Sequence, residues 1–208
     1  MILDPQTIPI QEMYRHMVAC ITPRPIAWVS TCDAEGRLNL APFSYFNGVG
    51  ANPPAIMFSP VNRRDGSRKD TVLNIEATKQ FVVNVVSFAL ADQMNQSSAD
   101  YDRGVSEFEM CGLTPEPSQQ VKPPRVKEAA VSMECELHQI VPVGDGPLSA
   151  NVIIGRVVLM HVAESVLDAA GRIDPDRLDT IGRMGGALYS RTRARFEMPR
   201  PSVPAIGS

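Results

Sequence analysis

Residues 21–54 read ITPRPIAWVSTCDAEGRLNLAPFSYFNGVGANPP, and this stretch decides the fold. Its prolines and glycines interrupt short apolar runs that have the length and composition of strands. Proline fixes φ and lacks the N–H that a sheet ladder needs, so each proline limits strand pairing where it stands. The segment therefore predicts short strands with unpaired backbone between them, bordered by Ser, Thr, Asn and Arg side chains.

Further strands and two or three helices are expected along the rest of the chain. Apolar residues at helical spacing predict a helix within 10–20, and residues 71–80 suit a short helix that Asp70 can cap. Residues 89–101 look helical as well. Strands are expected at 25–31, 38–49, 54–61 and 81–88, and 129–143 and 150–167 predict two long antiparallel strands joined around GDGP.

This order of elements predicts a mainly β fold, an antiparallel barrel with a few helices. The chain has neither a βαβ rhythm nor a GxGxxG motif, which argues against a dinucleotide-binding Rossmann domain. We expect a lead-in helix in residues 1–20, one domain over residues 21–192 and an extended C-terminal arm over residues 193–208.

Composition excludes several classes of protein. The 208 residues are 44% hydrophobic and 21% charged, as in an ordinary globular chain. A net charge of −3 gives no reason to expect a nucleic-acid partner. No apolar run is long enough to span a membrane and no leader opens the chain, so a cytoplasmic location is expected. The four cysteines and three histidines are scattered, which argues against a metal site and against local catalytic pairing.

The segment GSRKDT, residues 66–71, directly precedes a predicted helix. Arg68 and Lys69 supply cations, Thr71 supplies a hydroxyl, and the start of a helix supplies free backbone N–H groups. These groups together suit a phosphate. The alternative is a solvated basic turn, and the segment alone leaves both interpretations open.

The segment APFSYFN, residues 41–47, combines two aromatic residues with flanking polar ones. Ser44 and Asn47 flank Tyr45 and Phe46 in a region of strand-like composition. A strand edge freed by Pro and Gly can present N–H and C=O groups to a planar heterocycle, whose faces aromatic side chains can cover. The alternative is two core aromatics beside two surface polar residues.

Several separated motifs follow one another in a fixed order over about residues 21–192: PRPIAWVST, NLAPFSYFN, NPP, RKDT with NI, FVVNVV, IIGRVV and GRMGGALYSRT. In this order they resemble the flavin reductase-like family of FMN-binding split-barrel proteins, and more narrowly its flavoredoxin or NADH:FMN oxidoreductase branch. The resemblance implies a Greek-key split barrel that binds FMN non-covalently at a homodimer interface.

The resemblance also implies roles for particular residues. Ser30, Thr31, Ser44, Tyr45, Phe46 and Asn47 would border the isoalloxazine and ribityl chain, with Ser59 close to them. Arg68, Lys69 and Thr71 would hold the phosphate. Arg24, Arg183 and Tyr189 are further candidates that would reach the flavin from a neighbouring segment or subunit. One departure is Asn151, which stands where many wider-family members carry a His before a GxV strand.

The function implied is NAD(P)H-dependent reduction of FMN, with no catalytic side chain because the flavin carries the chemistry. One alternative is a flavodoxin-like electron carrier whose tightly bound FMN receives electrons from a protein partner. Another is a split-barrel binding module that has lost its flavin. The motifs do not distinguish NADH from NADPH, and they do not name the electron acceptor.

Overall fold

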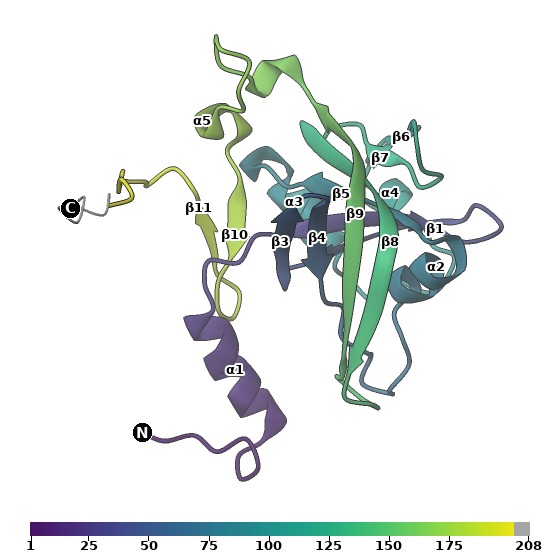
Figure 1. Cartoon of the computed structure of the whole chain (residues 1–208). Coiled ribbons are helices and arrows are strands. Elements are labelled where there is room, and N and C mark those ends of the chain that lie inside the picture. Colours follow the sequence, from purple (N-terminus) through teal and green to yellow (C-terminus); the bar gives the residue numbers. More distant parts are fainter. Residues whose placement is uncertain (202–208) are drawn as a thin grey trace, which may run out of the picture.

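A computed structural model describes residues 1–201 of the chain (Figure 1). Seven strands form one antiparallel sheet in the order β2-β1-β5-β8-β9-β4-β3. Their bounds are β1 Ala27–Cys32, β2 Leu38–Phe43, β3 Phe46–Ala51, β4 Pro54–Phe58, β5 Gln80–Val85, β8 Val131–Val143 and β9 Ala150–Val162. The mainly β barrel expected from the sequence is confirmed.

The two edge strands of this sheet are neighbours in the sequence. β2 ends at Phe43 and β3 begins at Phe46, so only Ser44 and Tyr45 join them, yet β2 and β3 lie at opposite ends of the strand order. The sheet must therefore curl until its two edges meet. Since β2 and β3 do not pair, the barrel stays open along a seam that passes Ser44 and Tyr45.

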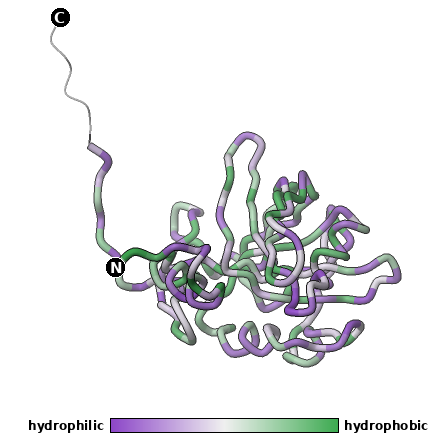
Figure 2. Tube along the Cα trace, turned by 90° about the horizontal axis from the view of Figure 1, so that it is seen from below, coloured by the Kyte–Doolittle hydropathy of each residue, from purple (hydrophilic) through white to green (hydrophobic). Residues whose placement is uncertain are grey.

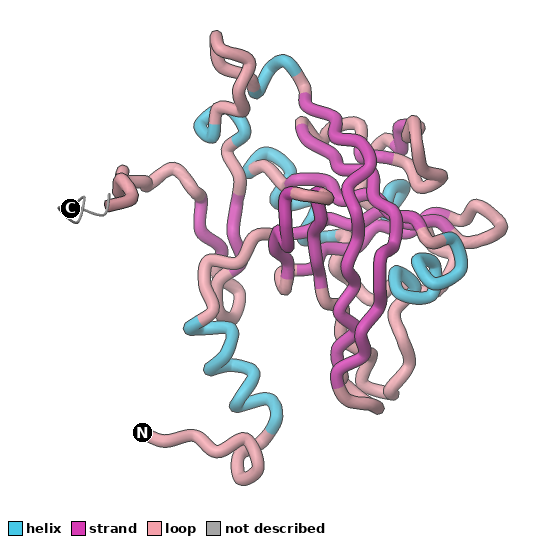
Figure 3. The backbone as a smooth tube through the Cα atoms, viewed as in Figure 1, coloured by secondary structure: helices cyan, strands magenta, loops and turns pink. Residues whose placement is uncertain are grey.

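Helices and short strands lie around and beside the barrel (Figure 3). The helices are α1 Ile10–Cys20, α2 Asp70–Thr78, α3 Ala91–Gln96, α4 Glu107–Met110 and α5 Pro175–Leu178, with short 3-10 turns η1 Phe88–Leu90 and η2 Glu164–Val166. Two small hairpins complete the fold, β6 Pro115–Glu116 with β7 Arg125–Val126, and β10 Ile181–Arg183 with β11 Tyr189–Arg191. None of the helices in residues 1–201 is long and apolar enough to cross a membrane.

Strand β1 is buried on both faces, and its alternating residues divide the core in two. Trp28 packs with η1, α3 and α4 on the outer face, where its indole N–H donates to Ser97 Oγ at 2.8 Å. Val29 packs inside the barrel with Phe81 and Ile75 of α2. Packing on both faces therefore holds β1 in position, and the pairing of β1 with β2 holds that edge strand as well.

Helix α1 stands apart from the barrel (Figure 1), and of its residues only Val18 is buried. The β10–β11 hairpin reaches the end of this helix, where Thr22 Oγ1 lies 2.7 Å from Met184 Sδ. The last described residues, beyond β11, run away from the body of the molecule (Figure 2). The arm expected over 193–208 is described to residue 201, and its remainder lies outside the described residues.

Several local expectations need correction. The strand expected over 38–49 is two strands separated by Ser44 and Tyr45 at the seam. Helix α2 has Lys69, not Asp70, at its N-cap position, and no side chain caps it. Asp70 is instead the first residue inside the helix, and its carboxylate accepts from Arg63 Nη2 at 2.8 Å. The long antiparallel pair β8–β9 is as expected.

Candidate functional site

A groove runs beside the seam, from the start of α2 to the β10–β11 hairpin. It consists of two adjoining cavities. The first, here the anion cavity, has a volume of about 140 Å³, and the second, the seam cavity, about 190 Å³. Pro42 and Ser98 line both, so the two cavities are neighbours. Edge strand β2 therefore forms a wall of the groove where it has no strand partner on its outer side.

The anion cavity is built around the start of α2. Lys69, Thr71 and Arg63 line it, and the backbone N–H groups of Asp70 and Thr71 have no hydrogen-bond partner in residues 1–201. Free N–H groups at a helix start attract anions, and the helix dipole adds to the attraction. The ammonium of Lys69 forms no ion pair within the described chain. This end of the groove can therefore bind a phosphate.

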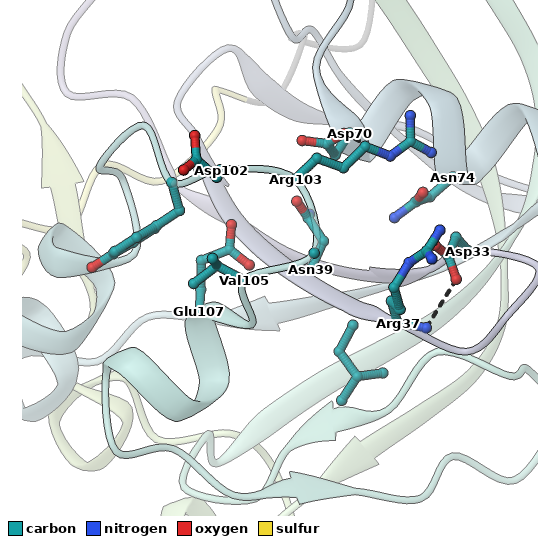
Figure 4. Close-up of a pocket in the computed structure, with 12 residues that line it drawn as sticks. Asp33, Arg37, Asn39, Asp70, Asn74, Asp102, Arg103, Val105 and Glu107 are labelled. Carbon is teal, nitrogen blue, oxygen red and sulfur yellow. Dashed lines mark hydrogen bonds and ion pairs between the residues drawn. The ribbon is translucent and has the colours of Figure 1, made fainter.

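Acidic side chains also line the anion cavity, namely Asp70, Asp100 and Glu107. Figure 4 shows the small adjoining pocket, in which Asp70, Asp102 and Glu107 lie near Asn39. Glu107 is buried, and its Oε2 accepts the backbone N–H of Leu40 in β2 at 2.8 Å. Burial raises the pKa of this carboxyl above its ordinary value. Glu107 therefore satisfies one edge amide of β2 and places a polar group beside the cavity.

The seam cavity lies between Ser44 and the β10–β11 hairpin. Arg183 and Tyr189 line it from the hairpin, and the guanidinium of Arg183 lies 4.4 Å from the centre of the Tyr189 ring. The Tyr189 hydroxyl donates to Asn95 Oδ1 of α3 at 3.4 Å, a long contact. Ile26 and Phe43 add apolar surface. This end of the groove thus offers an aromatic face and hydroxyl groups.

Arg24 holds the segments at this end of the groove together through hydrogen bonds. It is 5% exposed, and its guanidinium donates to the carbonyls of Val18 at 2.8 Å, Ile21 at 2.6 Å and Met184 at 3.1 Å. Its Nε donates to Ser44 Oγ at 3.3 Å. The donors of Arg24 are therefore used to tie α1, the β10–β11 hairpin and the seam together.

The structure brings five of the predicted site residues to the groove: Ser44, Lys69, Thr71, Arg183 and Tyr189. Arg68 does not line it, because its guanidinium pairs with Glu76 along α2. Arg63 lines the anion cavity in its place.

Ser30 and Thr31 lie behind the groove, both fully buried in β1. Ser30 Oγ donates to the carbonyl of Pro124 at 2.5 Å, on the outer face of the strand. Thr31 Oγ1 accepts from the amides of Asn74 at 3.0 Å and Asn39 at 3.4 Å. Because Asn39 lines the anion cavity, Thr31 supports the groove without lining it.

Four further predicted residues lie at or beyond the seam. The carbonyl of Tyr45 accepts the N–H of Ser59 at 2.9 Å, which links β3 to the end of β4. Burial raises the pKa of the Tyr45 phenol. Phe46 lines a separate cavity of about 230 Å³, and Asn47 is exposed and accepts the N–H of Gly48.

The sequence did not indicate several groove residues: Asn39, Arg63, Asn95, Ser97, Ser98, Tyr101 and Glu107. Arg63 belongs to the polar segment NRRDGSRKDT, but which of its cations faces the groove depends on the loop path. Asn39 belongs to β2 itself, and the others come from α3, α4 and the segment between them. Only the packing of these elements against β2 brings them to the groove.

Fold and site together define a class: an open antiparallel barrel with a polar groove along its seam that can accept an anion. The chain belongs to the flavin reductase-like family, whose model, described as "Flavin reductase like domain", matches residues 18–194. The resemblance that the sequence motifs carry is thereby confirmed.

Solved structures agree with this assignment. Nitrilotriacetate monooxygenase component B from Bacillus cereus is 38% identical, with a TM-score of 0.90 over 95% of this chain and 98% of that one. The 2-nitrobenzoate 2-nitroreductase of Pseudomonas fluorescens is 31% identical, with a TM-score of 0.86 over the full length of both chains. A protein with a split barrel domain from Shewanella frigidimarina is 25% identical, with a TM-score of 0.81 over 97% of this chain and all of the other.

Proposed function

We propose that this protein binds FMN in the groove and uses NADH or NADPH to reduce it. The observation that carries the proposal is the groove itself, which joins a cationic helix start to an aromatic-lined end at the seam. Such a groove suits a mononucleotide, with its phosphate at α2 and its flat ring system at the seam. Membership of the flavin reductase-like family supports a flavin as that ring system.

When bound, FMN supplies hydride and single-electron transfer. The residues of this chain bind and orient it. Lys69 and the N–H groups at the start of α2 hold the phosphate. Thr71 Oγ1 accepts a hydrogen bond from the Asn39 amide at 3.0 Å, so the hydroxyl hydrogen of Thr71 remains available to donate to the phosphate. Tyr189 covers one side of the seam cavity, and Arg24 fixes Ser44 by the hydrogen bond described above.

Two structural relatives support the oxidoreductase part of the proposal. The relative at 38% identity is named as a monooxygenase component, and the relative at 31% identity is named as a nitroreductase. Both names denote redox enzymes. Their substrates are properties of those proteins, and the proposal for this chain is limited to flavin and reduced nicotinamide.

A flavodoxin-like electron carrier is the second candidate function, because it would use the same groove. Rapid reduction by a partner reductase or ferredoxin, together with slow reduction by NADH and NADPH, would favour the carrier. A flavin-free binding module is the third candidate. Purified protein that is colourless and takes up no FMN would favour that module.

We also propose a homodimer. The edge strand β3 has its outer side unpaired, with Val49 55% exposed, and α1 exposes Ile10, Tyr14 and Met17. Open strand edges and contiguous apolar surface are commonly covered by a second copy in homodimers.

Equilibrium dialysis of the purified protein against FMN and riboflavin tests the binding step. Because the anion cavity would recognise the phosphate, FMN is expected to bind at least about tenfold more tightly than riboflavin. Equal affinities would contradict the placement of the phosphate at α2. Failure to bind either compound would contradict the proposed function.

A further inference from the structure

The loop that leads into α2, residues 62–69, lies against the turn of the long β8–β9 hairpin, residues 144–149 (Figure 1). This loop carries Arg63 and ends at Lys69, the two basic side chains that line the anion cavity. Core packing of α2 holds the loop at its C-terminal end. Its N-terminal end is held by the hairpin.

Asn62 makes most of the contact between the loop and the hairpin turn. Its backbone N–H donates to the carbonyl of Ser149 at 2.8 Å. Its side-chain Nδ2 donates to the carbonyl of Gly146 at 3.0 Å and to Ser149 Oγ at 2.9 Å. Further along the loop, a Cβ on Gly66 would lie 3.6 Å from Cδ of Pro147, so the two segments also touch there.

Asn151 of β9 holds Asn62 from the other side. Its backbone N–H donates to the carbonyl of Pro60 at 2.9 Å, and its Nδ2 donates to Asn62 Oδ1 at 2.8 Å. The carbonyl of Gly146 can only accept, so Asn62 must direct Nδ2 toward the hairpin turn and Oδ1 toward Asn151. Asn151 is 6% exposed, and it is the residue that stands where many wider-family members carry a His. Its side chain is used inside the protein.

Hydrogen bonds within the loop carry the position of Asn62 to the anion cavity. The N–H of Arg63 donates to the carbonyl of Ser67 at 2.8 Å, and Arg63 Nη1 donates to the carbonyl of Arg68 at 2.6 Å. These bonds join the two ends of the loop. A shift at Asn62 would therefore move Arg63 and the backbone next to Lys69.

We propose that Asn62 and Asn151 are positioning residues for the flavin phosphate and set the preference of the groove for FMN over riboflavin. This inference rests on the proposed function, because it assigns specificity-determining residues to the same site. Neither side chain lines the anion cavity or the seam cavity, so both act through Arg63 and Lys69. A binding site is precise only when such supporting hydrogen bonds hold the groups that contact the ligand.

Flavin fluorescence titration of two alanine variants tests the effect on specificity. Asn62→Ala and Asn151→Ala are each expected to raise the Kd for FMN about tenfold and to change the Kd for riboflavin less than about twofold. The reason is that only the phosphate contacts lose their alignment. The double variant should bind FMN about as tightly as Asn62→Ala alone, because removal of either partner breaks the same hydrogen bond.

Hydrogen–deuterium exchange of the flavin-free protein tests the effect on the loop itself. Backbone amides in residues 62–69 should exchange faster in both alanine variants than in the wild type, because the loop loses its attachment to the hairpin. Amides in residues 74–78 should keep the wild-type rates, since α2 stays packed in the core.

Asn84→Ala is the matched control, the same change at a fully buried asparagine that lines neither cavity. Asn84 Nδ2 donates to the carbonyl of Trp28 at 3.0 Å, and its Oδ1 accepts the N–H of Val126 at 2.9 Å. The variant should unfold at a lower temperature and keep the wild-type ratio of the Kd values for FMN and riboflavin. A general loss of stability is thereby separated from a loss of phosphate recognition.

Two results would overturn the inference: both alanine variants bind FMN as tightly as the wild type, or they lose affinity for FMN and riboflavin equally. A wild-type protein that binds neither flavin would instead contradict the proposed function. A wild type that binds both flavins equally would contradict the placement of the phosphate at α2. The failure of the inference is therefore distinguishable from the failure of the proposed function.

Discussion

Lys69 is the cation best placed to bind an anion in the groove. Arg68 pairs with Glu76, and Arg63 donates to the Arg68 carbonyl and to Asp70. The ammonium of Lys69 is left beside the free N–H groups of α2. Among the basic side chains of this loop, Lys69 should therefore contribute most to binding a phosphate.

Replacing Lys69 tests this point. Lys69→Ala is expected to raise the Kd for FMN about tenfold, the effect of losing one charge-assisted hydrogen bond, and to leave the Kd for riboflavin unchanged. Flavin fluorescence titration measures both constants. Lys127→Ala, at an exposed lysine outside the groove, is the control and should change neither constant. An equal loss for both flavins would contradict a phosphate contact.

Glu107→Gln tests the buried carboxyl beside the anion cavity. Burial raises the folded-state pKa of Glu107, so ionisation opposes folding. In the wild type, stability should fall as pH rises from the ordinary carboxyl pKa through the raised one. Gln keeps an oxygen that can accept the N–H of Leu40 but cannot ionise. The variant should therefore lose this decline and unfold at a higher temperature at neutral pH.

Thermal unfolding followed by circular dichroism between pH 4.5 and 7.5 measures this difference. Asp102→Asn, at an exposed carboxylate of the same pocket, serves as the control and should keep the wild-type pH dependence. A Glu107→Gln variant that is less stable than the wild type at every pH would mean that the charge of Glu107 is stabilising.

Arg183 and Tyr189 were predicted only from the family resemblance, and the other site residues could be predicted only where their role follows from local sequence. Lys69 and Thr71 lie at a helix start, and a helix start is readable from the chain. Glu107 and Asn95 come from short helices that no local pattern connects to β2. Arg24 could be recognised from the sequence as a cation. That it joins separate segments could not, because this depends on the carbonyls of Val18 and Met184 that accept its hydrogen bonds.

At the scale of elements, β9 requires a glycine where the side chain of Phe81 from β5 packs against it. A Cβ on Gly155 would lie 2.3 Å from Cζ and 2.8 Å from Cε1 of Phe81. Phe81 is fully buried and packs edge-on against Phe58, with ring centroids 5.4 Å apart, so it cannot move aside without disturbing the barrel interior. The absence of a side chain at residue 155 leaves room for the Phe81 ring beside β9.

Gly155→Ala should consequently destabilise the barrel by about 1–3 kcal/mol, the usual range for overpacking a core. Urea unfolding measures the change. Gly48→Ala is the matched control, because a Cβ there would meet no heavy atom within 4 Å and its φ is not positive. A Gly155→Ala variant as stable as the control would show that Phe81 can shift at little cost.

The long elements could be predicted from sequence, but their ends could not, and neither could the short helices α4 and α5 or the two small hairpins. The alternation in 131–143 and 150–162 and the β-branched run at 82–86 identify strands without further context. The break at Ser44 and Tyr45 is different. Both residues sit in a strand-like pattern, and the chain turns there because the curled sheet brings its two edges together.

At the scale of the whole molecule, the open β3 edge and the exposed face of α1 predict a second copy. Light scattering after size exclusion should give twice the 22.7 kDa chain mass. Tyr14→Lys and Met17→Lys place charge on the exposed face of α1 and should shift the mass toward a monomer if α1 lies in the interface. A wild-type mass of one chain would contradict the proposed dimer.

The central claim is that the groove at the seam binds FMN and lets a reduced nicotinamide reduce it. The most direct test is anaerobic stopped-flow absorbance of the FMN-loaded protein mixed with NADH or NADPH. The account predicts rapid loss of the oxidised flavin band with at least one of the two. If the band persists with both, the protein is not a nicotinamide-dependent flavin reductase.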